Sequence, residues 1–183
     1  MNMIFNRLPW LNCFNGRRES CEELLPLNEY NREPVILNVY DLFNVNEFGA
    51  ARIGLGIFHT GIQVYDKEYT YGGHSYSNSG IFEMMPRTAE IELGEHFHYR
   101  ESIQLGYTQF TRDEVMRIVE QLGCQFTGNS YHLTSNNCNH FSDAMSRILC
   151  GQQIPKWINR LAYFIDCVPF LQRCLPTEWM SPM

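Results

Sequence analysis

The order of apolar and polar residues in the first two thirds of the chain predicts a series of β-strands. Residues 35–41, "VILNVYD", are rich in β-branched side chains and are typical of a buried strand. Residues 54–73, "GLGIFHTGIQVYDKEYTYGG", predict two strands joined by a turn near Asp66 and Lys67. Two further strands are expected within residues 80–86, "GIFEMMP", and residues 98–108, "HYRESIQLGYT".

After residue 110 the apolar positions recur at helical spacing. In residues 111–123, "TRDEVMRIVEQLG", Thr111 and Glu114 have the spacing of a capping box, and Gly123 is expected to end the helix. In "IPKWINRLAYF" we expect another helix, with Pro155 at its first position.

Between these two segments, the stretch "NNCNHFSDAMSRILCG", residues 136–151, carries a single apolar stripe at helical spacing. Asn136 or Asn137 is expected to be its N-cap, and Gly151 lies beyond its last turn. Cys138 therefore falls in the first helical turn.

Strands that precede helices predict an α+β domain, in which helices pack on one face of a largely antiparallel sheet. A chain of 183 residues is long enough for one domain with a core and too short for two. Residues 1–32 have no sustained periodicity, so we expect a weakly ordered N-terminal arm. The domain itself is expected over residues 33–168, followed by a C-terminal tail over residues 169–183.

Composition and charge argue against several functions. The net charge is −6 and the basic residues are scattered, so we expect no nucleic-acid binding. Seven cysteines, an odd number, and an N-terminus without the order of a signal peptide indicate free thiols in a reducing, cytoplasmic compartment. No cysteine and histidine spacing typical of zinc occurs, so no metal or other cofactor is expected. The richest apolar stretch, residues 161–171, is short and interrupted, so no transmembrane segment is expected.

Cys138 is the candidate nucleophile. In the first turn of a helix, backbone N–H groups lack intrahelical partners, and together with the helix dipole they favour a thiolate over a thiol. Cys150 lies at the opposite end of the same predicted helix, where the dipole disfavours an anion. A packed cysteine is the alternative for Cys138, because a nucleophile also needs a base.

His59 is the candidate base. Strand alternation sends Phe58 and Thr60 to the apolar face and His59 to the other face, where Gly61 leaves room for a close approach. If that face adjoins the start of the Cys138 helix, the imidazole can accept the thiol proton and form a thiolate–imidazolium pair. An exposed or hydrogen-bonded strand histidine is the alternative. The other histidines considered near the site are His74, the second candidate, and His132 and His140, which are expected to be structural.

Five stretches of the chain occur in the order "VILNVYDL", "GIFHTGIQVYDKEYTYGGH", "GIFEMMP", "NCNHFSDAM" and "IPKWINRLAYF". Together they resemble the desumoylating isopeptidase family, also called the PPPDE superfamily. The later stretch "YFIDCVPFLQRCLPTEWMSP" is similar to the longer, second-type members. The resemblance covers the chain from about residue 33 to its end.

The resemblance implies a permuted papain-like cysteine peptidase fold, in which a catalytic histidine on a strand precedes a catalytic cysteine on a helix. His59 in "FHTG" and Cys138 in "NNCNHF" match these positions. The implied reaction is thiol attack on the isopeptide bond between ubiquitin or a SUMO-type modifier and a lysine, followed by hydrolysis of the acyl-enzyme. The backbone N–H of Cys138 is one expected oxyanion donor. Further oxyanion or cleft candidates are Asn136, Asn137, Tyr40 and His74.

Two alternatives remain open. The family is also associated with removal of fatty acyl groups from cysteine, so the same dyad could hydrolyse the thioesters of palmitoylated proteins. A module that binds a ubiquitin-like modifier without cleaving it is the non-enzymatic alternative. The resemblance further implies that the chain can form a homodimer.

Overall fold

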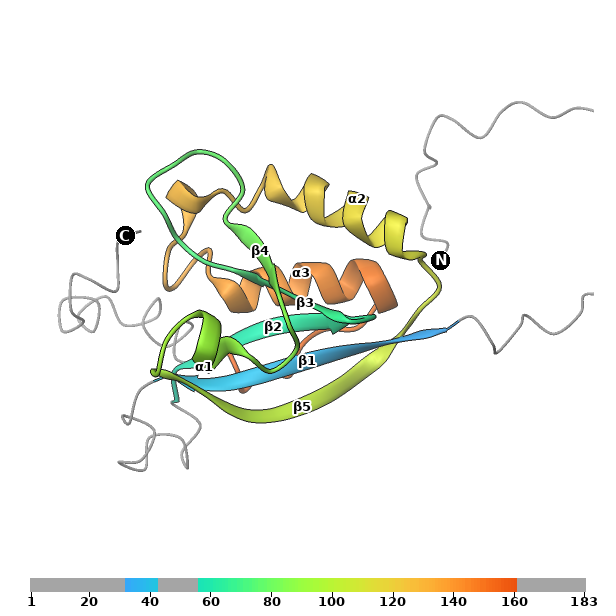
Figure 1. The fold of residues 1–183 in the computed structure, drawn as a ribbon, viewed down its shortest axis with the longest axis horizontal. Coiled ribbons are helices and arrows are strands. Elements are labelled where there is room, and N and C mark those ends of the chain that lie inside the picture. Colours follow the sequence, from blue (N-terminus) through green and yellow to red (C-terminus); the bar gives the residue numbers. More distant parts are fainter. Residues whose placement is uncertain (1–31, 43–55, 161–183) are drawn as a thin grey trace, which may run out of the picture. The chain divides into compact units, whose positions relative to one another are not determined.

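The computed structural model describes residues 32–42 and 56–160, which contain a five-stranded antiparallel sheet and the helices packed on it (Figure 1). The strand order is β4-β3-β2-β1-β5. The bounds are Glu33–Leu42 for β1, Phe58–Val64 for β2, Lys67–Tyr71 for β3, Ile81–Met84 for β4 and Phe97–Thr108 for β5. The prediction of an α+β fold with an antiparallel sheet is confirmed, and each of the five predicted strands is present.

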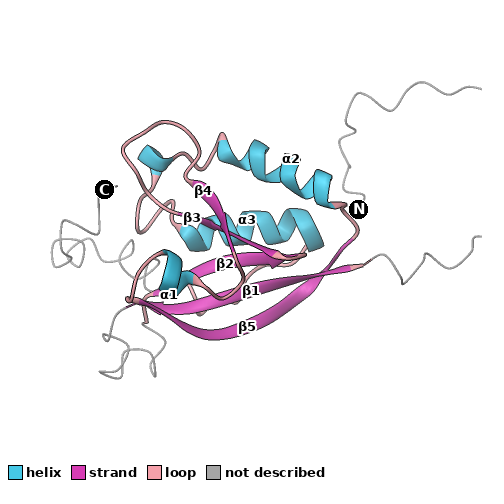
Figure 2. Ribbon diagram, in the orientation of Figure 1, coloured by secondary structure: helices cyan, strands magenta, loops and turns pink. Residues whose placement is uncertain are grey.

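The helices of the described residues are α1, Ala89–Glu92, α2, Arg112–Gly123, and α3, Cys138–Cys150, with a 3-10 turn over Gly128–Ser130. The two long helices, α2 and α3, follow all five strands in the chain. Figure 2 shows that they lie next to each other. Both were predicted. The capping box of Thr111 and Glu114 is formed, and Asn137 caps α3.

The main hydrophobic core lies between the sheet and α3. It combines alternate residues of β1 and β2 with residues of α3 that recur at helical spacing, among them Phe141 and Met145, which have no exposed surface. This pattern follows from the period of two in a strand and the period of 3.6 in a helix. The members from β1 and β2 are Val35, Leu37, Val39, Phe58, Ile62 and Val64.

The opposite face of the sheet is also buried, although its residues are more polar. Tyr40 packs there with Met84 and Ala89 in a second, smaller cluster. Glu68 lies fully buried beside them and accepts hydrogen bonds from Asn38 at 2.6 Å and from the Tyr40 hydroxyl at 2.9 Å. Burial raises the pKa of the Glu68 carboxyl above its ordinary value. β2 therefore has buried neighbours on both sides.

Two sequence predictions differ from the structure. Gly123 is the last residue of α2, but the helix does not end through a left-handed glycine, because the C-cap is Cys124 with φ −70°. At Pro155 the predicted third helix does not begin at once. Residues 156–159 form turns, with Ile158 donating its N–H to the Pro155 carbonyl at 3.1 Å, and helical geometry begins at Arg160. The remainder of that predicted helix lies outside the described residues.

The predicted arm over residues 1–32 lies outside the described residues except for Arg32, and so does the predicted tail over residues 169–183. The proposed domain boundaries therefore stay predictions. Among the helices of the described segments, none is long and apolar enough to cross a lipid bilayer.

Candidate active site

Cys138 is the first residue of α3, and Asn137 holds the start of that helix in place. Asn137 has extended backbone angles, φ −112° and ψ −177°, and its side-chain oxygen accepts the N–H groups of Asn139 at 3.0 Å and His140 at 3.1 Å. His140 completes a capping box by accepting the Asn137 N–H at 3.2 Å. At the other end Gly151 adopts the left-handed conformation, with φ 72°, as the sequence predicted.

The thiol of Cys138 is buried, with 3% of the residue exposed. It contacts the backbone N–H of Thr60 and the hydroxyl of Tyr131, and it lies 3.8 Å from the side-chain oxygen of Asn139. Burial raises the pKa of the thiol to about 11, and the hydrogen bonds from Thr60 and Tyr131 oppose that rise only in part.

The expectation that the start of the helix makes Cys138 a thiolate is therefore wrong for this structure. Desolvation of an anion in a buried site outweighs the neighbouring N–H groups and the helix dipole. At neutral pH the sulfur carries its proton. A base must remove that proton during the reaction.

The backbone N–H of Thr60 reaches the sulfur because two strands separate at this point. β2 and β3 are paired from Val64 opposite Lys67 only as far as Gly61 opposite Thr70, and β3 goes on to pair with β4. Thr60 therefore lies just beyond the β2–β3 ladder. Its hydroxyl lies 2.9 Å from the side-chain oxygens of Asn139 and Ser142, which ties β2 to the first turns of α3.

His59 is the residue next to Thr60, and its side chain points to the opposite face of β2. The imidazole ring packs edge-on against Phe97, with centroids 5.0 Å apart, and lies 6.2 Å from the ring of Tyr40. Its Nε2 atom is 2.8 Å from the hydroxyl of Thr70. Burial lowers the pKa of His59 to about 4, so the ring is neutral at pH 7.

The structure places the Cys138 thiol beside the backbone N–H of Thr60, the residue after His59, while the imidazole ring lies on the other face of β2. In the described part of the chain, the imidazole bonds to Thr70 and makes no hydrogen bond to the thiol. Cysteine–histidine pairs are often loose until a substrate aligns them. The His59–Cys138 dyad stays a prediction.

Of the four oxyanion and cleft candidates from the sequence, Asn137 alone lines the described pocket beside Cys138. The Tyr40 hydroxyl instead bonds to both oxygens of Glu68 at 2.9 Å, on the face of the sheet that carries His59. Asn136 donates to the Ser130 carbonyl at 2.9 Å, and His74 lies 3.1 Å from the Ser79 carbonyl. These bonds hold Asn136 and His74 in their loops, and a role of either residue in the cleft stays a prediction.

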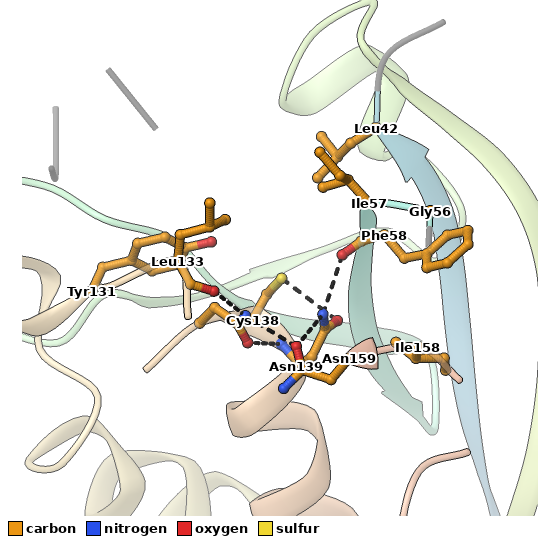
Figure 3. Close-up of a pocket in the computed structure, with 11 residues that line it drawn as sticks. Leu42, Gly56, Ile57, Phe58, Tyr131, Leu133, Cys138, Asn139, Ile158 and Asn159 are labelled. Carbon is orange, nitrogen blue, oxygen red and sulfur yellow. Dashed lines mark hydrogen bonds between the residues drawn. The ribbon is translucent and has the colours of Figure 1, made fainter. Parts of the chain in front are cut away.

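A narrow pocket opens at the Cys138 thiol between β2 and the loop before α3 (Figure 3). Figure 3 shows the sulfur between the strand that carries Phe58 and the loop that carries Tyr131 and Leu133. One wall is apolar, and amide side chains form much of the remainder. The lining residues are Leu42, Gly56, Ile57, Phe58, Tyr131, Leu133, Asn137, Cys138, Asn139, Ile158 and Asn159.

The sequence analysis did not single out three polar residues of this pocket, which are Tyr131, Asn139 and Asn159. Asn159 accepts the side-chain amides of Asn137 at 3.2 Å and Asn139 at 3.3 Å, so three asparagines form one network beside the thiol. Tyr131 comes from a loop, and the pattern of apolar residues gives no signal for it. The repeated asparagines of "NNCN" indicated the N-cap of α3, but they did not indicate the network beside the thiol.

Among the described residues, no group of three acidic, histidine or cysteine side chains is placed to hold a metal ion.

Comparison with known proteins now identifies the fold family. The model of the "PPPDE putative peptidase domain" matches residues 33–179. The chain belongs to the PPPDE family. Its match contains the strand with His59, the helix start with Cys138 and the pocket between them.

Named PPPDE relatives come from distant organisms. The chain is 50% identical to a desumoylating isopeptidase 1 homolog of Caenorhabditis elegans over 149 residues, which are 81% of this chain and 44% of that protein. It is 43% identical to a DeSI-like protein of Arabidopsis thaliana, over 74% of this chain and 59% of the relative. It is 30% identical to desumoylating isopeptidase 1 of Rattus norvegicus, over 80% of this chain and 84% of the rat protein. The chain thus spans less than two thirds of the nematode and plant proteins. Membership of the second-type subgroup stays a prediction.

Proposed function

We propose that this PPPDE chain is a cysteine isopeptidase that releases SUMO, or a ubiquitin-type modifier, from lysine side chains, with Cys138 as nucleophile and His59 as base. The observation that carries the proposal is the thiol of Cys138, which lies at the start of α3 in a narrow pocket and contacts the N–H of the residue after His59. The names of the nematode and rat relatives support SUMO conjugates as the substrates.

The pKa values of the pair decide how the proton moves. With a thiol pKa of about 11 and an imidazole pKa of about 4, both groups are neutral before the reaction. We infer that the thiol proton passes to His59 as the sulfur bonds to the isopeptide carbonyl carbon, rather than before that step.

The remaining steps use groups that adjoin the sulfur. Negative charge develops on the carbonyl oxygen, where the backbone N–H of Cys138 and the hydroxyl of Tyr131 can donate. The C–N bond then breaks, and His59 returns the proton to the departing lysine amine. A water molecule, deprotonated by His59, finally hydrolyses the thioester and regenerates the thiol.

The test is a SUMO protein with a C-terminal electrophile, such as a vinyl sulfone, that forms a covalent adduct with an active-site cysteine. We expect an adduct with the wild-type chain and with a Cys124→Ala control, since Cys124 is exposed on the surface at the end of α2. We expect none with Cys138→Ala. An adduct that persists in Cys138→Ala would contradict the proposal.

A second candidate is thioester hydrolysis of S-acylated proteins by the same residues. The apolar wall of the pocket, with Leu42, Ile57 and Phe58, favours it because a fatty acyl chain needs apolar contacts. A fluorogenic acyl thioester and a SUMO-type isopeptide substrate, offered in parallel, distinguish the two. Binding of the modifier without hydrolysis of either substrate would favour a non-catalytic module.

A further inference from the structure

The hydroxyl of Thr70 bridges the backbone of β2 and the ring of His59. Its oxygen lies 2.9 Å from the carbonyl oxygen of Thr60 and 2.8 Å from Nε2 of His59. Thr70 is fully buried, so solvent does not compete for these bonds. Its backbone position is fixed because Thr70 faces Gly61 in the last pair of the β2–β3 ladder.

These two contacts determine which ring nitrogen carries the proton. A hydroxyl has one proton to donate, and a carbonyl oxygen can only accept, so the Thr70 proton points to Thr60. The lone pair of the Thr70 oxygen then faces Nε2, which must be the donor. In the neutral ring the other nitrogen, Nδ1, is left without a proton.

We propose that Thr70 is a positioning residue that holds His59 in the Nε2–H tautomer and so makes Nδ1 the nitrogen that accepts the Cys138 proton. This inference rests on the proposed function, because it assigns a part to a third residue of the same reaction. Thr70 does not touch the substrate or the sulfur. It acts through the orientation and the tautomer of the imidazole.

The bond to Thr70 also persists when His59 accepts a proton. Nε2 keeps its hydrogen in the imidazolium, so the Thr70 oxygen accepts a charge-assisted hydrogen bond in the intermediate. The ionisable side chain beside the ring on this face is Tyr40, whose hydroxyl binds Glu68. Tyr99 packs against Tyr40, and Arg87 lies close to both Tyr99 and Glu68. Cys138, the other member of the proposed dyad, is ionisable as well and contacts β2 through the backbone N–H of Thr60. Neither Tyr40 nor Glu68 is hydrogen-bonded to the ring, so Thr70 is the direct partner of His59 among the described residues.

The first measurement reads the tautomer directly, by nitrogen NMR of the histidine rings in the full chain at pH 7. A His59→Gln variant assigns the His59 signals among the six histidines. We expect a protonated Nε2 and a bare Nδ1 in the wild-type chain and in Thr70→Ser, and a mixture of tautomers in Thr70→Val. A wild-type ring protonated at Nδ1 would overturn the inference without use of any variant.

The second measurement is turnover of a SUMO-type isopeptide substrate across a range of pH. One net hydrogen bond corresponds to roughly a tenfold effect, so we expect Thr70→Val to lower kcat by about tenfold, with KM unchanged and recovery in Thr70→Ser. The control is Thr108→Val, a buried threonine at the far end of β5. Wild-type turnover and an unchanged pH profile in Thr70→Val would contradict the role of Thr70.

The two proposals fail in distinguishable ways. Turnover that survives Cys138→Ala refutes the proposed function, whatever the tautomer of His59. Turnover that requires Cys138 and His59 but ignores Thr70 refutes only the role of Thr70.

Discussion

The hydroxyl of Thr60 lies 2.9 Å from the side-chain oxygen of Asn139, and this bond fixes β2 against the residue after Cys138. Both partners are buried. The same strand segment therefore contacts the start of α3 through a side chain, and the Cys138 thiol through its backbone N–H.

Loss of the Thr60 hydroxyl should loosen this junction. We expect Thr60→Val to lower the free energy of unfolding by about 1–3 kcal/mol, because buried polar groups of Asn139 and Ser142 lose a partner. Urea unfolding measures the change. Thr60→Ser, which keeps the hydroxyl, should stay closer to the wild-type value, and equal losses in both variants would contradict the role of the bond.

The thiols should differ in their rates of alkylation. Cys138 is buried with a pKa of about 11, whereas Cys124 is exposed, so iodoacetamide at pH 7.5 should modify Cys124 first. Peptide mass spectrometry of the native chain after short exposures gives both rates. Fastest labelling at Cys138 would show that the thiol ionises despite its burial.

His59 should make the fold sensitive to mild acid. Its pKa is about 4 in the folded chain and 6.5 ordinarily, so between these values the unfolded chain binds a proton that the folded chain does not. The contribution of neutral His59 to the free energy of unfolding is present in full above pH 6.5. It is lost as the pH falls towards 4, by roughly 3 kcal/mol in total. Urea unfolding at pH 7 and pH 4.5 measures the loss.

The comparison with His59→Gln isolates this effect. Glu68 has a raised pKa and acts in the opposite direction, since it prefers its proton in the folded state, but it is present in both proteins. The variant should lose less stability on acidification than the wild-type chain. Equal losses would show that His59 is not the group responsible.

Tyr131 should contribute to turnover through its hydroxyl. Tyr131→Phe keeps the ring contact with Tyr71, whose centroid is 5.1 Å away. It removes the hydroxyl that bonds to the sulfur and lies beside the Cys138 N–H. We expect kcat for a SUMO-type substrate to fall by roughly tenfold or more. Tyr107→Phe, at an exposed position of β5, is the matched control and should turn over normally.

Much of the fold could be predicted from the sequence because its elements are regular. The turn between β2 and β3, the capping box of α2 and the asparagine cap of α3 each have a local pattern of residues. The four-residue helix α1 was missed because one turn is too short to show a period. The prediction that Gly123 ends α2 as a left-handed cap was wrong for a different reason. A Cβ atom at Gly123 would lie 2.8 Å from the Ser79 hydroxyl, so close packing explains the glycine.

The site was less predictable because its chemistry depends on tertiary contacts. The position of Cys138 in the first turn follows from its neighbours in sequence, but its pKa depends on how deeply α3 packs against β2. Tyr131 and Thr70 come from separate segments, and nothing in their local sequence links them to the cysteine or the histidine.

The separation of β3 from β2 beyond Gly61 has a consequence for how related chains are compared. The donor that it frees at residue 60 belongs to the main chain, and every amino acid except proline carries the same group there. An alignment column at this position would record side-chain changes while the amide that faces the sulfur persisted through all of them. The amino acid at position 60 can therefore change during evolution while the backbone contact with the Cys138 sulfur is kept.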